Sequence, residues 1–240
     1  MDFTHLYKTK PLKSVDEDLA EINETFRDLH KKGKNSLKLV NYYHGLPLSF
    51  PAQMVSFDHG MLDLDVHPQQ AVAIELSHYA FIRCDAFKSD ICASVQYVNA
   101  QKRAATLTKF FYIDIMAEKR NSIRLRLGTP TDASFDCNSN SPVSGKLVDL
   151  SMGGIAIVAG NEPECERGQE SHIQFMLPNI IQNNLINVTT TGTLLDVRDE
   201  EKSVLCTFAI SADNALEQQI SKYIFQRQVE IIQELRDASF

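Results

Sequence analysis

The stretch I-M-A-E-K-R-N-S-I-R-L-R-L, residues 115–127, separates two β-rich parts of the 240-residue chain. Short apolar or alternating runs, broken by Gly and Pro, occur on both sides of it, and this pattern is typical of small all-β domains. Six strands in about 80 residues before the stretch favour a small barrel over a βαβ fold. The strands expected there are residues 37–43, 48–57, 61–66, 81–84, 91–98 and 104–112.

The part after residue 127 predicts a second small barrel followed by a long helix. Several runs, such as residues 204–210, alternate apolar and polar side chains as half-buried strands do. A helix over residues 215–236 follows, with Asp213 or Asn214 as its N-cap. We therefore expect a mainly β fold of two small β-barrels in tandem, with an N-terminal and a C-terminal helix. The strands expected in the second part are residues 133–137, 143–150, 155–158, 172–177, 188–197 and 204–210, and the apolar stripe of its helix is Leu216, Ile220, Tyr223, Ile224, Ile231 and Leu235.

Residues 14–32 predict an amphipathic helix. Ser14 and Glu17 have the spacing of a capping box, and acidic residues occupy the first turn. An apolar stripe runs for about two heptads, which is fewer than a coiled coil normally has. We expect this helix to pack on its own domain, with a homodimer contact through it as the alternative. The stripe consists of Val15, Leu19, Ile22, Phe26 and Leu29.

Charge argues against a long nucleic acid as the partner. The net charge is −7, and residues 120–240 hold 10 basic against 16 acidic side chains. A duplex-binding domain normally has a basic excess that neutralises phosphates. A small anionic ligand is compatible with this charge, because two well-placed arginines can bind it on an acidic domain.

The chain is expected to be cytoplasmic and to lack a transmembrane segment. No apolar run approaches the roughly 20 residues that span a bilayer, and the N-terminus lacks the apolar region of a signal peptide. The cysteines are odd in number and contain no C-x-x-C, so we expect reduced thiols. Neither they nor the seven histidines have the spacing of a metal site, and no metal or other cofactor is expected. The cysteines are Cys84, Cys92, Cys137, Cys165 and Cys206.

Two short motifs carry the chemistry. The first is R-N-S-I-R, with Arg120 and Arg124 four residues apart at the entry to the second part. The second is D-L-S-M-G-G, which begins at Asp149 at an expected strand end. Either motif alone is weak, since the second can be an ordinary Asx or Ser turn. In this order, before a β-barrel and a closing helix, the pair is much more specific.

The two motifs resemble those of the PilZ domain, the bacterial receptor module for cyclic di-GMP. The resemblance covers about residues 119–236, and no motif position departs from the pattern. The preceding part looks, by layout alone, like the split-barrel-like N-terminal domain of flagellar-brake proteins. This implies a division into an N-terminal helical extension (1–35), a β-barrel-like domain (36–116) and a PilZ domain with its C-terminal helix (117–240).

The residue types suit the two phosphates and two guanines that this resemblance implies. An arginine fork can bind the O6 and N7 atoms of guanine for roughly 1–3 kcal/mol, and it also stacks on bases or clamps phosphate. Asp149 offers an acceptor for guanine N–H groups, and Ser151 a small donor and acceptor. Glycine lets the backbone bend and the ligand approach closely. The resemblance assigns cyclic di-GMP binding to Arg120, Arg124, Asp149, Ser151, Gly153 and Gly154, with Lys119 and Arg126 as auxiliary cations.

The expected function is that of a receptor that performs no chemistry. Binding at the linker and the second barrel would reorient the domains and control a protein partner with a motility, biofilm or exopolysaccharide output. The alternative is a degenerate interaction module that binds no nucleotide. An enzyme is not expected, because the sequence contains no clustered acids and histidines for two metals, no G-x-S-x-G and no P-loop.

Overall fold

The structure is a computed structural model that describes residues 6–137, 142–200 and 202–239. The chain forms two compact units, one of Met1–Asn121 with Ile232–Phe240 and one of Ser122–Ile231. In the described part of the chain, no helix is long and apolar enough to cross a membrane.

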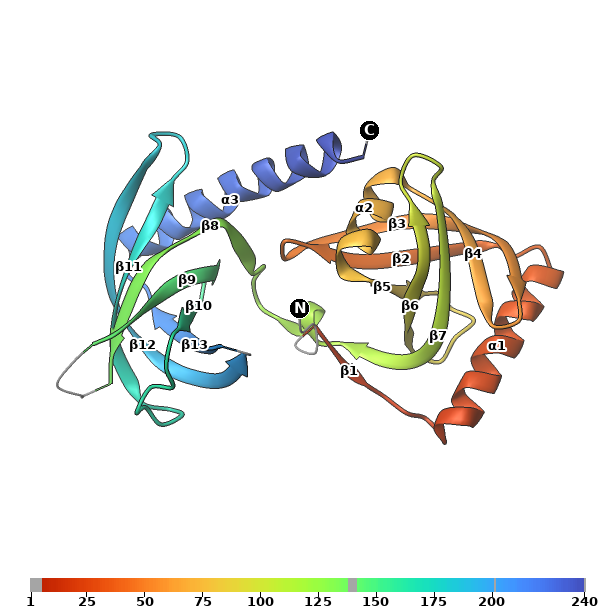
Figure 1. Cartoon of the computed structure of the whole chain (residues 1–240), viewed down its shortest axis with the longest axis horizontal. Helices are drawn as coiled ribbons and strands as arrows, with labels where there is room; N and C mark the ends of the chain where they lie inside the picture. The colour runs from red at the N-terminus through yellow and green to blue at the C-terminus, as the bar shows by residue number, and fades with distance from the viewer. Residues whose placement is uncertain (1–5, 138–141, 201, 240) are drawn as a thin grey trace. The chain divides into compact units, whose positions relative to one another are not determined.

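The first unit is built on an antiparallel sheet whose strands close into a ring (Figure 1). The strand order is β1-β7-β4-β3-β2-β5-β6, and a further pairing of β6 with β7 closes the ring. The short strand β1 adds to the edge of β7 beyond the residues that pair with β4. The strands are β1 (Tyr7–Thr9), β2 (Ser36–Tyr43), β3 (Leu46–Asp58), β4 (Met61–Val66), β5 (Tyr79–Arg83), β6 (Asp90–Asn99) and β7 (Ala104–Ile115).

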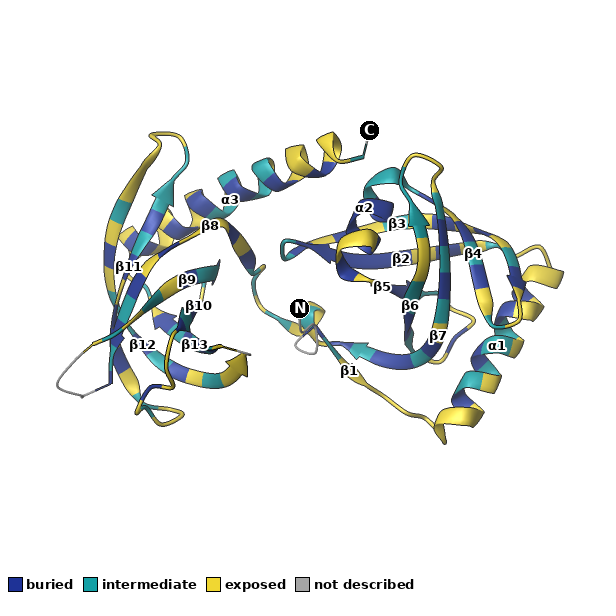
Figure 2. Cartoon of the chain, in the orientation of Figure 1, coloured by how far each residue is buried: buried dark blue, intermediate teal, exposed yellow. Residues whose placement is uncertain are grey.

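The helix α1 (Val15–Lys31) belongs to the core of this unit. The predicted capping box is present, because the Ser14 side chain accepts from the Glu17 amide and Glu17 reaches back to the Ser14 backbone. Buried and exposed residues alternate along α1 (Figure 2). Ile22 and Phe26 are fully buried against β3 and β7, whereas Val15 is 75% exposed. The buried part of the apolar stripe thus packs into the core of its own domain, as expected. The alternative, a homodimer contact through this helix, gains no support.

A second helix, α2 (Pro68–Ser77), was not expected from the sequence. Pro68 looks like a strand breaker, but it occupies the first turn of the helix, where its missing N–H costs nothing. The helix contacts β2 and β6, and it is buried on several sides, so it lacks the one-sided stripe that predicts a surface helix. Its Gln70 donates to Asn41 of β2 at 2.7 Å, inside the core.

The second unit is a closed six-stranded barrel, with strand order β10-β13-β12-β11-β8-β9. Its core is filled by the inward side chains of all six strands and by the first turns of α3. The prediction of a mainly β fold with two tandem barrels and a helix near each end is therefore confirmed. The elements are β8 (Leu125–Asp136), β9 (Val143–Ser151), β10 (Gly154–Ala159), β11 (Glu170–Asn179), β12 (Asn184–Glu200), β13 (Ser203–Ser211) and α3 (Asn214–Asp237); a 3-10 turn, η1 (Met116–Lys119), follows β7 in the first unit.

A disulfide corrects the expectation that all five cysteines are reduced thiols. Cys137, directly after β8, is bonded to Cys165 in the loop after β10, with their Cα atoms 5.6 Å apart. They are 28 residues apart in the sequence, and only the barrel brings them together. Closing a loop of this length stabilises a fold by about 3–4 kcal/mol in the chain-entropy model. Cys84, Cys92 and Cys206 are free thiols.

The ion pairs of Glu21 predict a pH dependence of the first unit's stability. Glu21 of α1 pairs with Lys88 at 2.6 Å and with Lys13 at 2.9 Å. Hydrogen bonds from Lys88 and then Lys13 lower the pKa of Glu21 from its ordinary 4.5 to about 2. A carboxyl whose pKa is depressed by folding stabilises the fold above its unfolded pKa, and this contribution is lost as the pH falls from about 4.5 towards about 2.

We therefore expect Glu21→Gln to lower the urea midpoint of the first unit at pH 7 and to lower it much less near pH 2.5. Glu24→Gln is the matched control, because Glu24 lies exposed on the same helix and makes no ion pair with a described residue. If the two substitutions lower the urea midpoint equally at pH 7, the ion pairs of Glu21 do not stabilise the packing of α1.

Candidate functional site

The register of β8 against β9 brings the two sequence motifs together. Leu125 pairs with Leu150, and Arg126 pairs with Asp149, in an antiparallel ladder. Arg124 comes directly before β8, so its side chain reaches the end of β9 that carries Asp149. The Nε of Arg124 lies 3.7 Å from Oδ1 of Asp149. The structure thus brings one residue of each motif, Arg124 and Asp149, close together.

The pair of Arg124 and Asp149 is partly shielded from solvent. The two side chains are 26% and 17% exposed, which places their charges at the rim of the barrel and out of bulk water. Their separation of 3.7 Å is longer than an N–H···O hydrogen bond. The buried Nε of Arg124 makes no hydrogen bond to any part of the chain that the structure describes. The guanidinium therefore retains donor capacity for an acceptor that approaches the pair.

The D-x-S-x-x-G motif forms the tight turn between β9 and β10. Ser151 and Gly154 face each other as the last pair of the hairpin, with two residues at its tip. The hydroxyl of Ser151 is buried and donates to the carbonyl of Gly154 at 3.1 Å. Ser151 was expected to serve a ligand as both donor and acceptor, but its O–H is used inside the turn. Its lone pairs remain the part of the hydroxyl that can serve a ligand.

The two glycines of the motif have different roles. A Cβ on Gly154 would lie 2.8 Å from the carbonyl oxygen of Phe208 on β13, so this position is closed by the neighbouring strand. A Cβ on Gly153 would meet nothing within 4 Å, and the residue is exposed. Close approach of a ligand is therefore a role that Gly153 can have, whereas Gly154 is required by strand packing.

The remaining predicted cations are divided by the boundary between the units. Arg126 is exposed on β8 beside Asp149, in the second unit. Lys119 ends η1 in the first unit, where its ammonium pairs with Asp114 at 3.0 Å. Arg120 also belongs to the first unit, and its charge acts on Tyr42 there. Burial raises the pKa of the Tyr42 phenol to about 12, and the nearby Arg120 opposes that rise.

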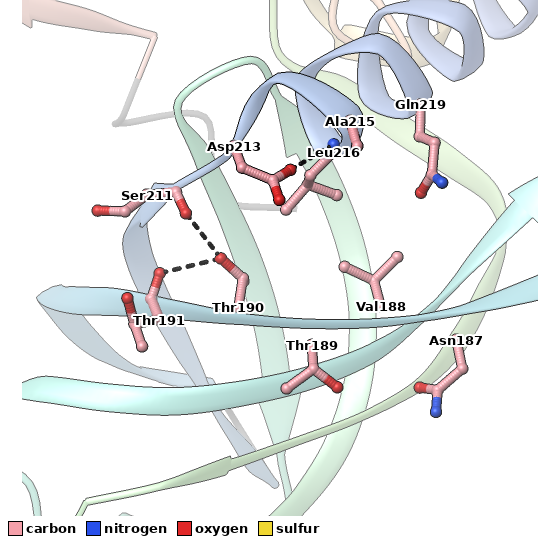
Figure 3. Close-up of a pocket in the computed structure, with 10 residues that line it drawn as sticks. All are labelled: Asn187, Val188, Thr189, Thr190, Thr191, Ser211, Asp213, Ala215, Leu216 and Gln219. Atoms are coloured by element: carbon pink, nitrogen blue, oxygen red, sulfur yellow. Dashed lines mark hydrogen bonds between the residues drawn. The ribbon is translucent and has the colours of Figure 1, made fainter.

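A polar cavity of about 350 Å³ lies elsewhere on the second unit, between β12, the end of β13 and the start of α3 (Figure 3). Two of its polar side chains make hydrogen bonds within the fold. Asp213 accepts from the Leu216 amide at 2.8 Å, and Thr190 donates to the Ser211 carbonyl at 2.9 Å. None of the predicted binding residues lines it. Across residues 6–137, 142–200 and 202–239, no group of three His, Cys, Asp or Glu side chains is placed to hold a metal ion.

One buried cation near the site was missed by the sequence analysis. Arg227 of α3 is only 4% exposed, and its Nε donates to the carbonyl of Arg126 at 3.2 Å. A signal for it was present in the sequence. The apolar stripe of this helix passes from Ile224 to Ile231, and Arg227 occupies the turn between them on the buried face.

Residues 118–226 match the PilZ domain family. This region carries R-x-x-x-R, D-x-S-x-x-G, all six strands of the closed barrel and the first half of α3. Residues 118–226 are therefore a PilZ domain. No curated protein matches the chain in sequence.

Solved structures with similar folds include three proteins from different bacteria. YcgR from Escherichia coli, in complex with c-di-GMP, is 18% identical, with 99% of each chain covered and a TM-score of 0.44. The K. pneumonia MrkH–c-di-GMP complex is 14% identical, with 95% of this chain and 99% of that chain covered and a TM-score of 0.44. The Bacillus subtilis inhibitor of motility, MotI, is 13% identical, with 82% and 97% covered and a TM-score of 0.42. At these sequence identities and TM-scores, the ligands and activities of the three proteins are not assigned to this chain.

The glycines of the turn predict opposite responses to the same substitution. Gly154→Ala would force a methyl group against the Phe208 carbonyl, so we expect a loss of about 1–3 kcal/mol in the free energy of unfolding. Gly153→Ala meets open space, and we expect a change within about 0.5 kcal/mol. Urea unfolding followed by circular dichroism measures both. Equal losses for the two variants would mean that Gly154 is not confined by β13.

Proposed function

We propose that the chain is a receptor for cyclic di-GMP and that Arg124 and Asp149 are the centre of its binding site. The observation that carries the proposal is the convergence of this guanidinium and carboxylate at the rim of a PilZ domain barrel, 3.7 Å apart. The site would also use the auxiliary cation Arg126, the exposed backbone at Gly153 and the lone pairs of Ser151.

The chemistry of the ligand matches these groups. Each guanine presents O6 and N7 to a guanidinium and N–H groups to a carboxylate, so the pair can grip one base from two sides. The two phosphodiester groups, each with one negative charge, would be bound by the remaining arginines, since a planar guanidinium binds phosphate in a bidentate manner. The net charge of −7 does not oppose this, because the contacts are short and local.

We further propose that binding changes the arrangement of the two units. The boundary between them falls between Asn121 and Ser122, inside R-x-x-x-R. A ligand that holds both Arg120 and Arg124 would therefore tie a residue of one unit to a residue of the other. The difference in ligand affinity between the possible arrangements sets how far the ligand shifts their populations. The shifted arrangement would control a protein partner with a motility, biofilm or exopolysaccharide output in the cytoplasm.

One observation favours a second candidate, an interaction module that binds no nucleotide. Arg124 and Asp149 already form an ion pair with each other in the free protein, which partly compensates both charges. Breaking that pair costs the ligand part of its binding energy. Direct measurement of binding decides between a receptor and a module whose ion pair has only a structural role.

Calorimetry tests the receptor. We expect cyclic di-GMP to bind the full chain, and Arg124→Ala to weaken binding by about 100-fold, because charge-assisted hydrogen bonds contribute about 1.5–3 kcal/mol each. Lys146→Ala is the control, since this cation lies exposed on β9 and pairs with Asp132 at 2.6 Å. The nucleotide should be recovered unhydrolysed. The absence of binding heat with the unsubstituted protein would leave only the interaction module.

Small-angle scattering tests the rearrangement separately from binding. We expect saturating cyclic di-GMP to change the radius of gyration of the full chain. Arg120→Ala should remove that change while the ligand, added to saturation, still occupies the Arg124 site. Superimposable scattering curves with and without bound nucleotide would contradict the rearrangement and leave the binding site intact.

A further inference from the structure

The start of β8 is attached to the barrel by a very short piece of ladder. Only Leu125 and Arg126 pair with β9 at this end, and the next pair along β8 is Thr131 with Leu147. Residues 127–130 lie between these pairs, opposite the single residue Val148. Pro130 in this segment has no N–H to donate to a ladder. Within the single strand β8, this irregularity therefore separates the two ladder pairs that follow Arg124 from the rest of the β8–β9 ladder.

Arg227 of α3 supports this isolated segment from the helix side. Its Nε donates to the Arg126 carbonyl at 3.2 Å, on the residue whose pairing with Asp149 sets the site. Its guanidinium also lies against Gly128, where an added Cβ would come within 3.3 Å of Cζ. A methyl group at residue 128 would thus make the guanidinium shift by a few tenths of an ångström. One buried side chain contacts two residues of the segment.

A buried cation at this position requires these contacts. Arg227 is 4% exposed, and an arginine taken out of water is tolerated only when its N–H groups have partners. Its Nη1 donates to Glu230 on the same helix at 3.1 Å, which supplies an opposite charge. Burial raises the pKa of the Tyr223 phenol to about 12, and the positive charge of Arg227 opposes that rise. The guanidinium is therefore held from α3 and directed at β8.

We propose that Arg227 is a positioning residue for the cyclic di-GMP site. It holds the Leu125–Arg126 segment so that Arg124 meets Asp149, and it thereby couples ligand binding to the anchoring of α3. The coupling is reciprocal: a ligand that orders the segment also stabilises the contact with α3. The identity of the ligand in this inference rests on the proposed function. The contacts of Arg227 do not depend on it.

The test uses the full chain with three substitutions in α3 and one in β8. Arg227→Met removes the charge and the hydrogen bonds and keeps much of the volume, and Arg227→Lys restores the charge without the fork. Gly128→Ala crowds the guanidinium, which must shift by a few tenths of an ångström, but leaves Arg227 in place. It covers the case that Arg227→Met fails to fold. Lys222→Met is the control, because Lys222 is an exposed cation on the same helix.

Hydrogen exchange and calorimetry are the measurements. Without ligand, we expect Arg227→Met to speed amide exchange in residues 125–129 while the thermal midpoint of the second unit stays well above the assay temperature. Affinity for cyclic di-GMP should fall about tenfold in Arg227→Met and Gly128→Ala, less in Arg227→Lys, and not in Lys222→Met. At saturating ligand, the protection that the ligand confers on residues 223–231 should disappear in Arg227→Met.

The outcomes separate this inference from the proposed function. Suppose that the unsubstituted chain binds cyclic di-GMP and that Arg227→Met and Gly128→Ala bind it with the same affinity. If both variants also have unchanged amide exchange rates and unchanged ligand-dependent protection of α3, the positioning role is wrong. If the unsubstituted chain binds no cyclic di-GMP, the proposed function fails. In that case, unchanged exchange in residues 125–129 would overturn the positioning role as well, and faster exchange would uphold the structural contact.

Discussion

The two-residue ladder of Leu125 and Arg126 with Leu150 and Asp149 is the contact on which the site depends. It is short, it lies at the end of the sheet, and it alone brings an arginine before β8 beside a carboxylate on β9. The resulting charges are partly shielded and 3.7 Å apart, which is close enough to attract each other but longer than a hydrogen bond between them. A shift of one residue in this register would turn the Asp149 side chain to the other face.

The turn that follows Asp149 is held by its own groups and by the neighbouring strand. Ser151 donates to Gly154 across the hairpin, and β13 leaves no room for a side chain at Gly154. Conserving the geometry of such a turn requires a small hydroxyl residue and a glycine even when neither touches a ligand. Gly153 is the open position. A motif whose members all look like ligand contacts thus divides into residues that build the turn and residues that face outward.

Most of the helices and strands could be predicted from local patterns, and the exceptions have identifiable causes. α2 is buried on several sides, so it shows no one-sided stripe, and Pro68 in its first turn imitates a strand break. The start of β8 pairs through only two residues, too few for an alternating pattern. The disulfide of Cys137 with Cys165 joins residues that only barrel closure brings together. Arg227 interrupts an apolar stripe, but its partner Arg126 is 101 residues away.

The class of fold, the two barrels, the capped helix α1 and the two motifs could be derived from the amino-acid sequence, because they follow from short-range periodicity, capping chemistry and residue type. The contact between Arg124 and Asp149 and the confinement of Gly154 became visible only in the folded chain. Those facts depend on strand register and on atoms from distant segments meeting within a few ångströms. Local spacing carries no information about such distances, since the same pattern is compatible with several registers.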